Sequence, residues 1–182
     1  EIPSAPNNVV TLGYGFEDHL LALGVTPAAS ALYIERDVPP YLADRMKDVQ
    51  FIGTGGEVNF EALTDISPDL IIGAHYWHTE MYDSLKKIGT TAILDAESLN
   101  VLNWRGTHLK FGELVGKEEE AQKNIADFDA RLQQVKDQLH QKIGDETFMI
   151  MMMLPKEIRV YGKSNNHFAV FLYLSLIHIS EP

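Results

Sequence analysis

Residues 56–72 read GEVNFEALTDISPDLII, which predicts a short capped helix, a Pro-Asp turn and a buried strand in succession. Asn59 is a preferred helix N-cap, because its side chain can accept a hydrogen bond from the free amides of the first turn. Phe60 and Leu63 are three residues apart and therefore share one helix face. Glu61 lies between them and points elsewhere, so we expect its side chain to be exposed to solvent.

Short β-rich runs alternate with helical patterns on both sides of this stretch. The predicted strands are 9–12, 29–34, 49–52, 70–73 and 91–94. The predicted helices besides the one at Asn59 are 16–23, 41–46, 80–88 and 102–115. No Asn-Gly hairpin pattern joins consecutive strands, so the alternation predicts an α/β fold with a parallel sheet and crossover helices.

A different pattern follows between residues 118 and 143, where one narrow apolar stripe continues for 26 residues. The stripe consists of Ala121, Ile125, Phe128, Leu132, Val135, Leu139 and Ile143. It predicts a helix about 39 Å long, with a coiled coil as the alternative although fewer than four heptads are present. Beyond it, 148–154 and 158–161 are predicted as neighbouring strands around a turn, and a run of methionines such as 151–153 is usually part of a core.

Composition and missing motifs exclude several functions. The formal charge of −11 argues against nonspecific nucleic-acid binding, and the absence of cysteine excludes disulfides and thiolate chemistry. The glycines at 53–56 lack the Lys and Ser/Thr of a P-loop. Gly13 and Gly15 lack the third glycine of a dinucleotide fingerprint, and no Gly-x-Ser-x-Gly elbow occurs. We therefore predict that the chain is not an enzyme and carries no cofactor.

Both ends of the chain have unusual features. The chain starts at Glu1 with no signal-peptide pattern, which leaves a removed leader and a record that begins within a gene as alternatives. Residues 174–182 match the translation of a common transposon adapter used in sequencing libraries. We expect them to be read-through rather than native sequence, the alternative being a natural apolar tail.

Five short segments, taken in order, resemble the binding proteins for ferric siderophores, haem and cobalamin. They are Val9–Leu12, Leu23–Pro27, Asn59–Glu61, Pro68–Ile71 and Leu114–Glu118. The resemblance implies an N-terminal α/β lobe at 1–116, a long inter-lobe helix at 117–144 and the start of a truncated second α/β lobe at 145–173.

The resemblance also implies a function. Such proteins capture a ligand between two lobes outside the cytoplasm, in the periplasm or lipid-anchored on the membrane, and deliver it to an ABC permease. An exposed Glu on each lobe pairs with permease arginines, and Glu61 matches the N-lobe position. Its alternative role is a first-turn carboxylate favoured by the helix dipole. We expect a ferric siderophore as ligand, with haem and cobalamin as alternatives. A cytoplasmic sensor fused to a DNA-binding regulator and a lobe-only interaction module are the other classes considered.

Ligands of open α/β sheets bind beyond the carboxyl ends of the strands. That rule selects Tyr14, Arg36, His75, Tyr76, Trp77, Trp104 and Arg105 as candidate contacts, with Arg159 facing them from the second lobe. Arginine and aromatic rings suit anionic, aromatic ferric complexes. Two alternatives stay open: Trp104 could pack the lobe against the long helix, and His75 with His78 could ligate a metal.

Overall fold

The computed structural model describes residues 6–13, 15–32, 38–54, 56–99, 103–144 and 150–161. The chain divides into two compact units, Glu1–Asn124 and Ile125–Pro182. None of the helices in these described ranges has the length and apolar character that crossing a membrane requires. The predicted read-through at 174–182 lies outside the described residues.

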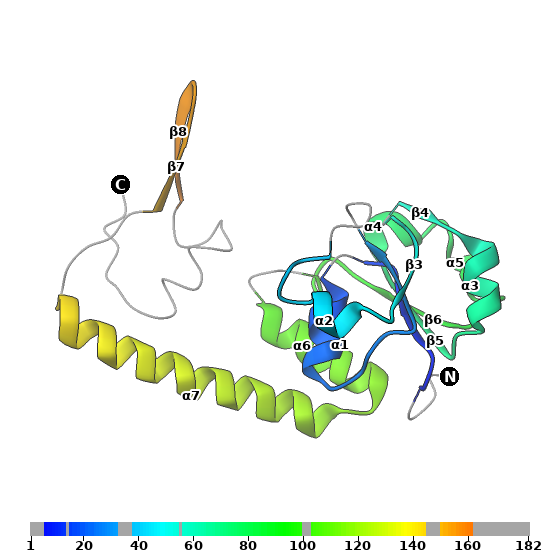
Figure 1. Cartoon of the computed structure of the whole chain (residues 1–182), viewed down its shortest axis with the longest axis horizontal. Helices are drawn as coiled ribbons and strands as arrows, with labels where there is room; N and C mark the ends of the chain where they lie inside the picture. The colour runs from blue at the N-terminus through cyan, green and yellow to red at the C-terminus, as the bar shows by residue number, and fades with distance from the viewer. Residues whose placement is uncertain are drawn as a thin grey trace. The chain divides into compact units, whose positions relative to one another are not determined.

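The first unit contains a sheet of six strands in the order β4-β3-β2-β1-β5-β6 (Figure 1). Its elements are β1 (Val9–Thr11), β2 (Ala29–Leu32), β3 (Gln50–Thr54), β4 (Glu57–Val58), β5 (Leu70–Ala74) and β6 (Thr90–Leu94). Five strands pair in parallel, which confirms the predicted α/β fold. The antiparallel edge strand β4 was not predicted, because two residues are too short to show an alternating pattern.

The order of the strands reverses beside β1. From β1 the chain adds β2 and β3 on one side, then returns to place β5 and β6 on the other. Val10 of β1 is therefore paired with Ala29 of β2 and with Ile71 of β5. In doubly wound sheets this reversal opens a crevice at the carboxyl ends of the two strands, here β1 and β5.

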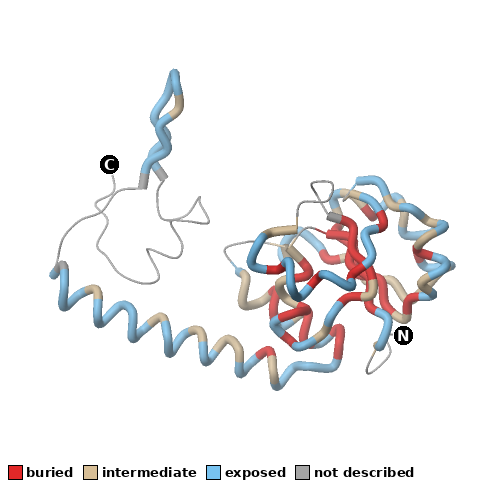
Figure 2. Tube along the Cα trace, viewed as in Figure 1, coloured by how far each residue is buried: buried red, intermediate tan, exposed pale blue. Residues whose placement is uncertain are grey.

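Helices cover both faces of this sheet (Figure 1). One apolar cluster joins β1, β5 and β6 to α1 (Phe16–Ala22), α6 (Trp104–Val115) and the start of α7 (Glu118–Ile143). A second cluster joins the opposite face to α3 (Phe60–Ile66) and α5 (Tyr82–Leu85). The short helix α2 (Ala43–Met46) packs on α1 through a third cluster. The buried positions follow the strands and the inner helix faces (Figure 2).

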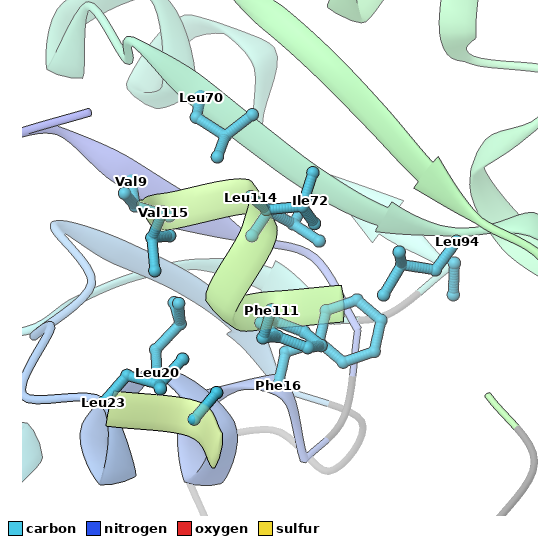
Figure 3. Close-up of a cluster of buried hydrophobic side chains, with 12 residues drawn as sticks. Val9, Phe16, Leu20, Leu23, Leu70, Ile72, Leu94, Phe111, Leu114 and Val115 are labelled. Carbon is cyan, nitrogen blue, oxygen red and sulfur yellow. The ribbon is translucent and has the colours of Figure 1, made fainter. Parts of the chain in front are cut away.

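Alternation along β5 supplies both clusters. Leu70 and Ile72 point to the α1 and α6 face, whereas Ile71 points to the α3 and α5 face, and all three are fully buried. Each contributes roughly 1.5–3 kcal/mol by its burial. On the first face the rings of Phe16 and Phe111 meet edge to face at 5.1 Å between centroids (Figure 3).

The helix boundaries test the sequence analysis directly. Asn59 caps α3 as predicted, because its Oδ1 accepts a hydrogen bond from the Ala62 amide at 3.0 Å, and Glu61 is exposed. Residues 80–88 were predicted as one helix, but α5 spans Tyr82–Leu85 with turns around it. The segment nevertheless packs on the sheet through one apolar face, since Leu85 is fully buried and Met81 and Ile88 pack against the second cluster.

A close approach joins α6 to α7. Gly116 ends α6 with φ 66°, a left-handed conformation that glycine adopts at little cost. A Cβ on Gly112 would lie 2.7 Å from the Cβ of Ala121, so only glycine allows the two helices this near each other. Ala121, the first residue of the apolar stripe, is fully buried at this contact.

In the second unit, α7 continues to Ile143, as predicted. The stripe residues Ile125, Phe128, Leu132 and Leu139 are half-buried, and Val135 is exposed. A hairpin of β7 (Ile150–Leu154) and β8 (Glu157–Tyr161) follows, which confirms the predicted strand pair within the described range. The expectation that the methionine run lies in a core is wrong here. Met151, Met152 and Met153 are 49%, 41% and 75% exposed, because the pairing of β7 with β8 joins backbone edges and does not itself cover the faces that carry side chains.

A polar relay crosses the junction of α1, α6 and α7. The Nδ2 of Asn124 donates to the carbonyl oxygen of Ala22 at 2.8 Å and lies 3.3 Å from His108 Nε2. Since an amide nitrogen only donates, His108 Nε2 accepts and its proton is on Nδ1. That Nδ1 lies 3.2 Å from His19 Nδ1, which must then accept and be unprotonated. The relay therefore requires both imidazoles to be neutral.

Burial lowers the pKa of His19 from its ordinary 6.5 to about 4, and the charge of His108 acts in the same direction. Burial also lowers the pKa of His108. Several charged side chains on the same helices are paired elsewhere: Glu17 with Thr11 and Ser30, Asp18 with Tyr41, Lys110 with Glu113, and Lys123 with Glu120.

We predict that acid weakens the first unit through His19. The unfolded chain takes up a proton near pH 6.5 and the folded chain near pH 4, so stability falls as the pH drops through that interval, by at most about 3 kcal/mol. Urea unfolding followed by circular dichroism at several pH values measures the slope. His19→Gln should flatten the slope, whereas replacing the exposed His140 by Gln should not. An unchanged slope in His19→Gln would contradict the assignment.

Candidate functional site

The candidate site lies along the edge where the parallel strands end. Because β1, β2, β5 and β6 run in the same direction, the segments that follow them leave from one edge of the sheet. Of the predicted contacts, Tyr14 follows β1 and Arg36 follows β2, and both lie outside the described residues. His75, Tyr76 and Trp77 follow β5, and Trp104 and Arg105 follow β6. The topology therefore brings the described candidates of the first unit to one edge.

The segment after β5 is the helix α4 (His75–His78), which lies between the predicted strand 70–73 and the predicted helix 80–88 and was itself not predicted. The Ala74 amide donates to His78 Nδ1 at 3.0 Å, and His78 is fully buried beneath the turn. A Cβ on Gly73 would lie 3.1 Å from the His78 Cβ and 2.8 Å from Ile93 Cδ1, so glycine permits this tight return. The buried histidine anchors the turn that presents the preceding residues.

Three consecutive rings of α4 are arranged edge to face. His75 and Tyr76 have centroids 5.1 Å apart, and Tyr76 and Trp77 have centroids 4.7 Å apart. Tyr76 is 51% exposed and Trp77 is half-buried. Burial raises the pKa of the Tyr76 hydroxyl, so it stays protonated and able to donate near neutral pH. The result is an aromatic surface with a hydroxyl donor beside it.

His75 adds a polar atom to this surface. Its Nδ1 is buried, and no hydrogen-bond partner for it occurs among the described residues. A buried polar atom left unpaired costs about 1–3 kcal/mol, so such atoms in a folded protein call for an explanation. A ligand that hydrogen-bonds Nδ1 would remove that cost.

The end of β6 supplies a carboxylate that the sequence analysis did not select. The Oδ1 of Asp95 accepts a hydrogen bond from the Ser98 amide at 2.8 Å. This amide, together with the Ser98 hydroxyl, holds the pKa of Asp95 below its ordinary value, and the charge of His75 contributes in the same direction. Asp95 and His75 are therefore electrostatic neighbours across the ends of β5 and β6.

Trp104 and Arg105 begin α6. Asn103 caps this helix by accepting a hydrogen bond from the Gly106 amide at 3.2 Å. The Arg105 guanidinium lies over the Trp104 ring, 4.7 Å from its centroid, in a cation–π arrangement. The hydroxyl of Thr107 donates to the Ser98 carbonyl oxygen and attaches α6 to the turn after β6. The stacked guanidinium and indole thus lie together at the start of α6 and combine a positive charge with an aromatic surface.

The other predicted residues lie elsewhere. No group of three His, Asp or Glu side chains able to hold a metal ion occurs in the described part of the chain, and His78 Nδ1 is engaged with its own turn. Arg159, on β8 in the second unit, is exposed and its Nε donates to Glu157 at 2.6 Å. Glu61 lies on α3, which follows the edge strand β4, and three strands separate β4 from β5.

A buried acid beneath the edge was also missed. Glu17, in the first turn of α1, is only 2% exposed. Its Oε1 accepts hydrogen bonds from the hydroxyls of Thr11, at 2.9 Å, and Ser30. Next to Asp18, in the first turn of a helix, it has the sequence pattern of an exposed carboxylate. The sequence feature that could have indicated Glu17 is its position shortly after the end of β1, at the start of the next helix.

Known proteins share this architecture. A family model described as periplasmic binding protein matches residues 9–173. The probable siderophore-binding lipoprotein YfiY of Bacillus subtilis (strain 168) is 35% identical over 164 residues, covering 88% of this chain and 48% of that protein. The iron(3+)-hydroxamate-binding protein FhuD of the same strain is 29% identical, covering 97% of this chain and 53% of that protein.

Solved structures agree. Staphylococcus aureus SirA complexed with staphyloferrin B matches with a TM-score of 0.75 and 25% identity, covering 97% of this chain and 60% of that chain. This chain spans about half the length of the curated relatives it matches. The match to the family model nevertheless runs from β1 to beyond β8 and includes every described strand. The chain belongs to the periplasmic binding protein family.

Proposed function

We propose that this chain is part of a solute-binding protein that captures a ferric siderophore and delivers it to the permease of an ABC importer. The observation that carries the proposal is the grouping, at one sheet edge, of the α4 aromatic surface with the stacked Trp104 and Arg105. Doubly wound sheets bind their ligands at this edge.

The chemistry of the edge suits an anionic chelate. A guanidinium is planar, always charged and able to donate two parallel hydrogen bonds to ligand oxygens. Indole and phenol rings offer flat apolar surface to the organic part of such a complex. The Nδ1 of His75 adds a position for a further hydrogen bond.

The relatives support transport over the other classes. The proteins named above are described as a probable siderophore-binding lipoprotein, an iron(3+)-hydroxamate-binding protein and a protein complexed with staphyloferrin B. We accordingly propose an extracytoplasmic location and the lobe arrangement that the resemblance implies: 1–116, an inter-lobe helix at 117–144 and the start of a second lobe at 145–173. None of these names describes a DNA-binding regulator.

The first prediction concerns the ligand itself. The chain has two tryptophans, Trp77 and Trp104, and both belong to the proposed site. Titrating the full-length protein with a ferric hydroxamate, a ferric catecholate, ferric citrate, haem and cobalamin should give saturable quenching of tryptophan fluorescence with at least one ferric chelate. Quenching by haem or cobalamin alone would redirect the ligand assignment, and no binding to any of the five would remove the proposal.

The second prediction concerns Arg105. Arg105→Gln should weaken binding of the ferric chelate at least tenfold, about 1.4 kcal/mol, because a charge-assisted contact is lost. Arg105→Lys should restore only part of the affinity, since an ammonium cannot reproduce the planar fork. Lys87→Gln is the matched control, because it removes the positive charge of an exposed side chain two residues after the end of α5. Equal affinities for Arg105→Gln and the control would exclude Arg105 from the site.

Trp104→Leu separates the two roles considered for this ring. Loss of chelate affinity at an unchanged melting temperature identifies a stacking contact. A lower melting temperature at unchanged affinity identifies packing against the rest of the fold.

We propose Glu61 as a permease contact. Its side chain is exposed on α3, and the side-chain cap of that first turn is Asn59, which accepts from the Ala62 amide. Glu61 is therefore not the side-chain cap of this helix. Three strands separate the edge strand before α3 from β5, so a permease bound to Glu61 would leave the ligand edge accessible.

Glu61→Arg should abolish uptake of the chelate by cells while leaving its affinity for the purified full-length protein unchanged, because the reversed charge would repel permease arginines. Asp65→Arg, an exposed acid on the same helix, should transport normally. Undiminished uptake by Glu61→Arg would refute the docking role.

A further inference from the structure

Glu17 connects three elements beneath the proposed ligand edge. Thr11 of β1 and Ser30 of β2 are direct neighbours in the sheet register, and both hydroxyls point to the face that α1 covers. The carboxylate of Glu17 accepts a hydrogen bond from each of them. A single side chain of α1 is therefore attached to two adjacent strands.

This attachment joins the end of β1 to the first turn of α1. Thr11 is the last residue of β1, and Glu17 is the second residue of α1. The hydrogen bond between them therefore holds the carboxyl end of β1 to the start of α1. Within the same connection, the Phe16 amide donates to the Gly13 carbonyl oxygen at 3.4 Å. Ser30 lies two residues before Leu32, the end of β2.

An acid in this position is costly. Burial raises the pKa of the Glu17 carboxyl, while hydrogen bonds from Ser30, its own amide and Thr11 act to lower it. Its donors among the described residues are two neutral hydroxyls and its own amide rather than a cation. An amide or a purely apolar side chain of similar size would avoid burying an ionisable group. The carboxyl oxygen matters here as an acceptor for two hydroxyls at once.

We propose that Glu17 is a positioning residue for ligand capture, which fixes the carboxyl ends of β1 and β2 at the proposed ligand edge. This inference rests on the proposed function. Glu17 acts through the two strand ends and makes no contact with ligand itself. Glu17 is nearly fully buried, so a search for exposed charged side chains would not find it.

The test uses the full-length protein and the ferric chelate that binds it most tightly in the titration above. Glu17→Gln retains an acceptor oxygen for both hydroxyls, so its dissociation constant should stay within twofold of the original protein. Glu17→Leu has similar volume but no acceptor, and its dissociation constant should rise at least tenfold. Both constants are measured well below the melting temperature, where circular dichroism shows each variant to be fully folded.

Thr11→Val with Ser30→Ala provides an independent route if Glu17→Leu does not fold. This double variant removes both donors and leaves Glu17 in place, and it should also weaken binding at least tenfold. Glu113→Leu, which changes an exposed acid on α6, is the control and should bind normally.

Two results would overturn the inference. One is a lower melting temperature with unchanged affinity in Glu17→Leu and in the double variant, which would identify a purely structural acid. The other is a loss of affinity in Glu17→Gln as large as in Glu17→Leu, which would show that the hydrogen bonds are not what matters. In either case the unmodified protein still binds the chelate, so these failures differ from failure of the proposed function, in which it binds none.

Discussion

The parallel pairing of β1 with β5 is the constraint on which the other features depend. Parallel strands need crossover connections, and these place helices on both faces of the sheet. Both strands are consequently buried on two sides, with Leu70 and Ile72 towards α1 and α6 and Ile71 towards α3 and α5. The same geometry places the carboxyl ends of the strands at one edge. The position of the proposed site thus follows from the way in which the core is built.

Helix α1 connects several of the polar groups buried in that core. Glu17 attaches its first turn to β1 and β2, and His19 connects its second turn to His108 of α6. Asn124 extends the second connection to α7. Buried polar groups stabilise a unique arrangement only if their partners are in place. One short helix therefore links the strands of the proposed ligand edge to α6 and to the start of α7.

Local patterns predicted much of the fold correctly. The Asn59 cap, the 26-residue helix from Glu118 to Ile143 and the strands at Leu70 and Ile150 depend on neighbours a few residues away, which a sequence displays. The edge strand β4 and helix α4 were missed because each is too short to show a period. The exposure of Met151 to Met153 was predicted wrongly, since burial depends on what covers a strand and not on its composition.

For the site, the order of elements along the chain was sufficient to select His75, Tyr76, Trp77, Trp104 and Arg105, because every parallel strand ends at the same edge. The fold was needed to find Asp95 beside His75, the Arg105 guanidinium on the Trp104 ring and the buried Glu17. Glu17 shows most plainly why the fold was needed. Glu17 and Ser30 are 13 residues apart, and only the register between β1 and β2 brings the hydroxyl to the carboxylate.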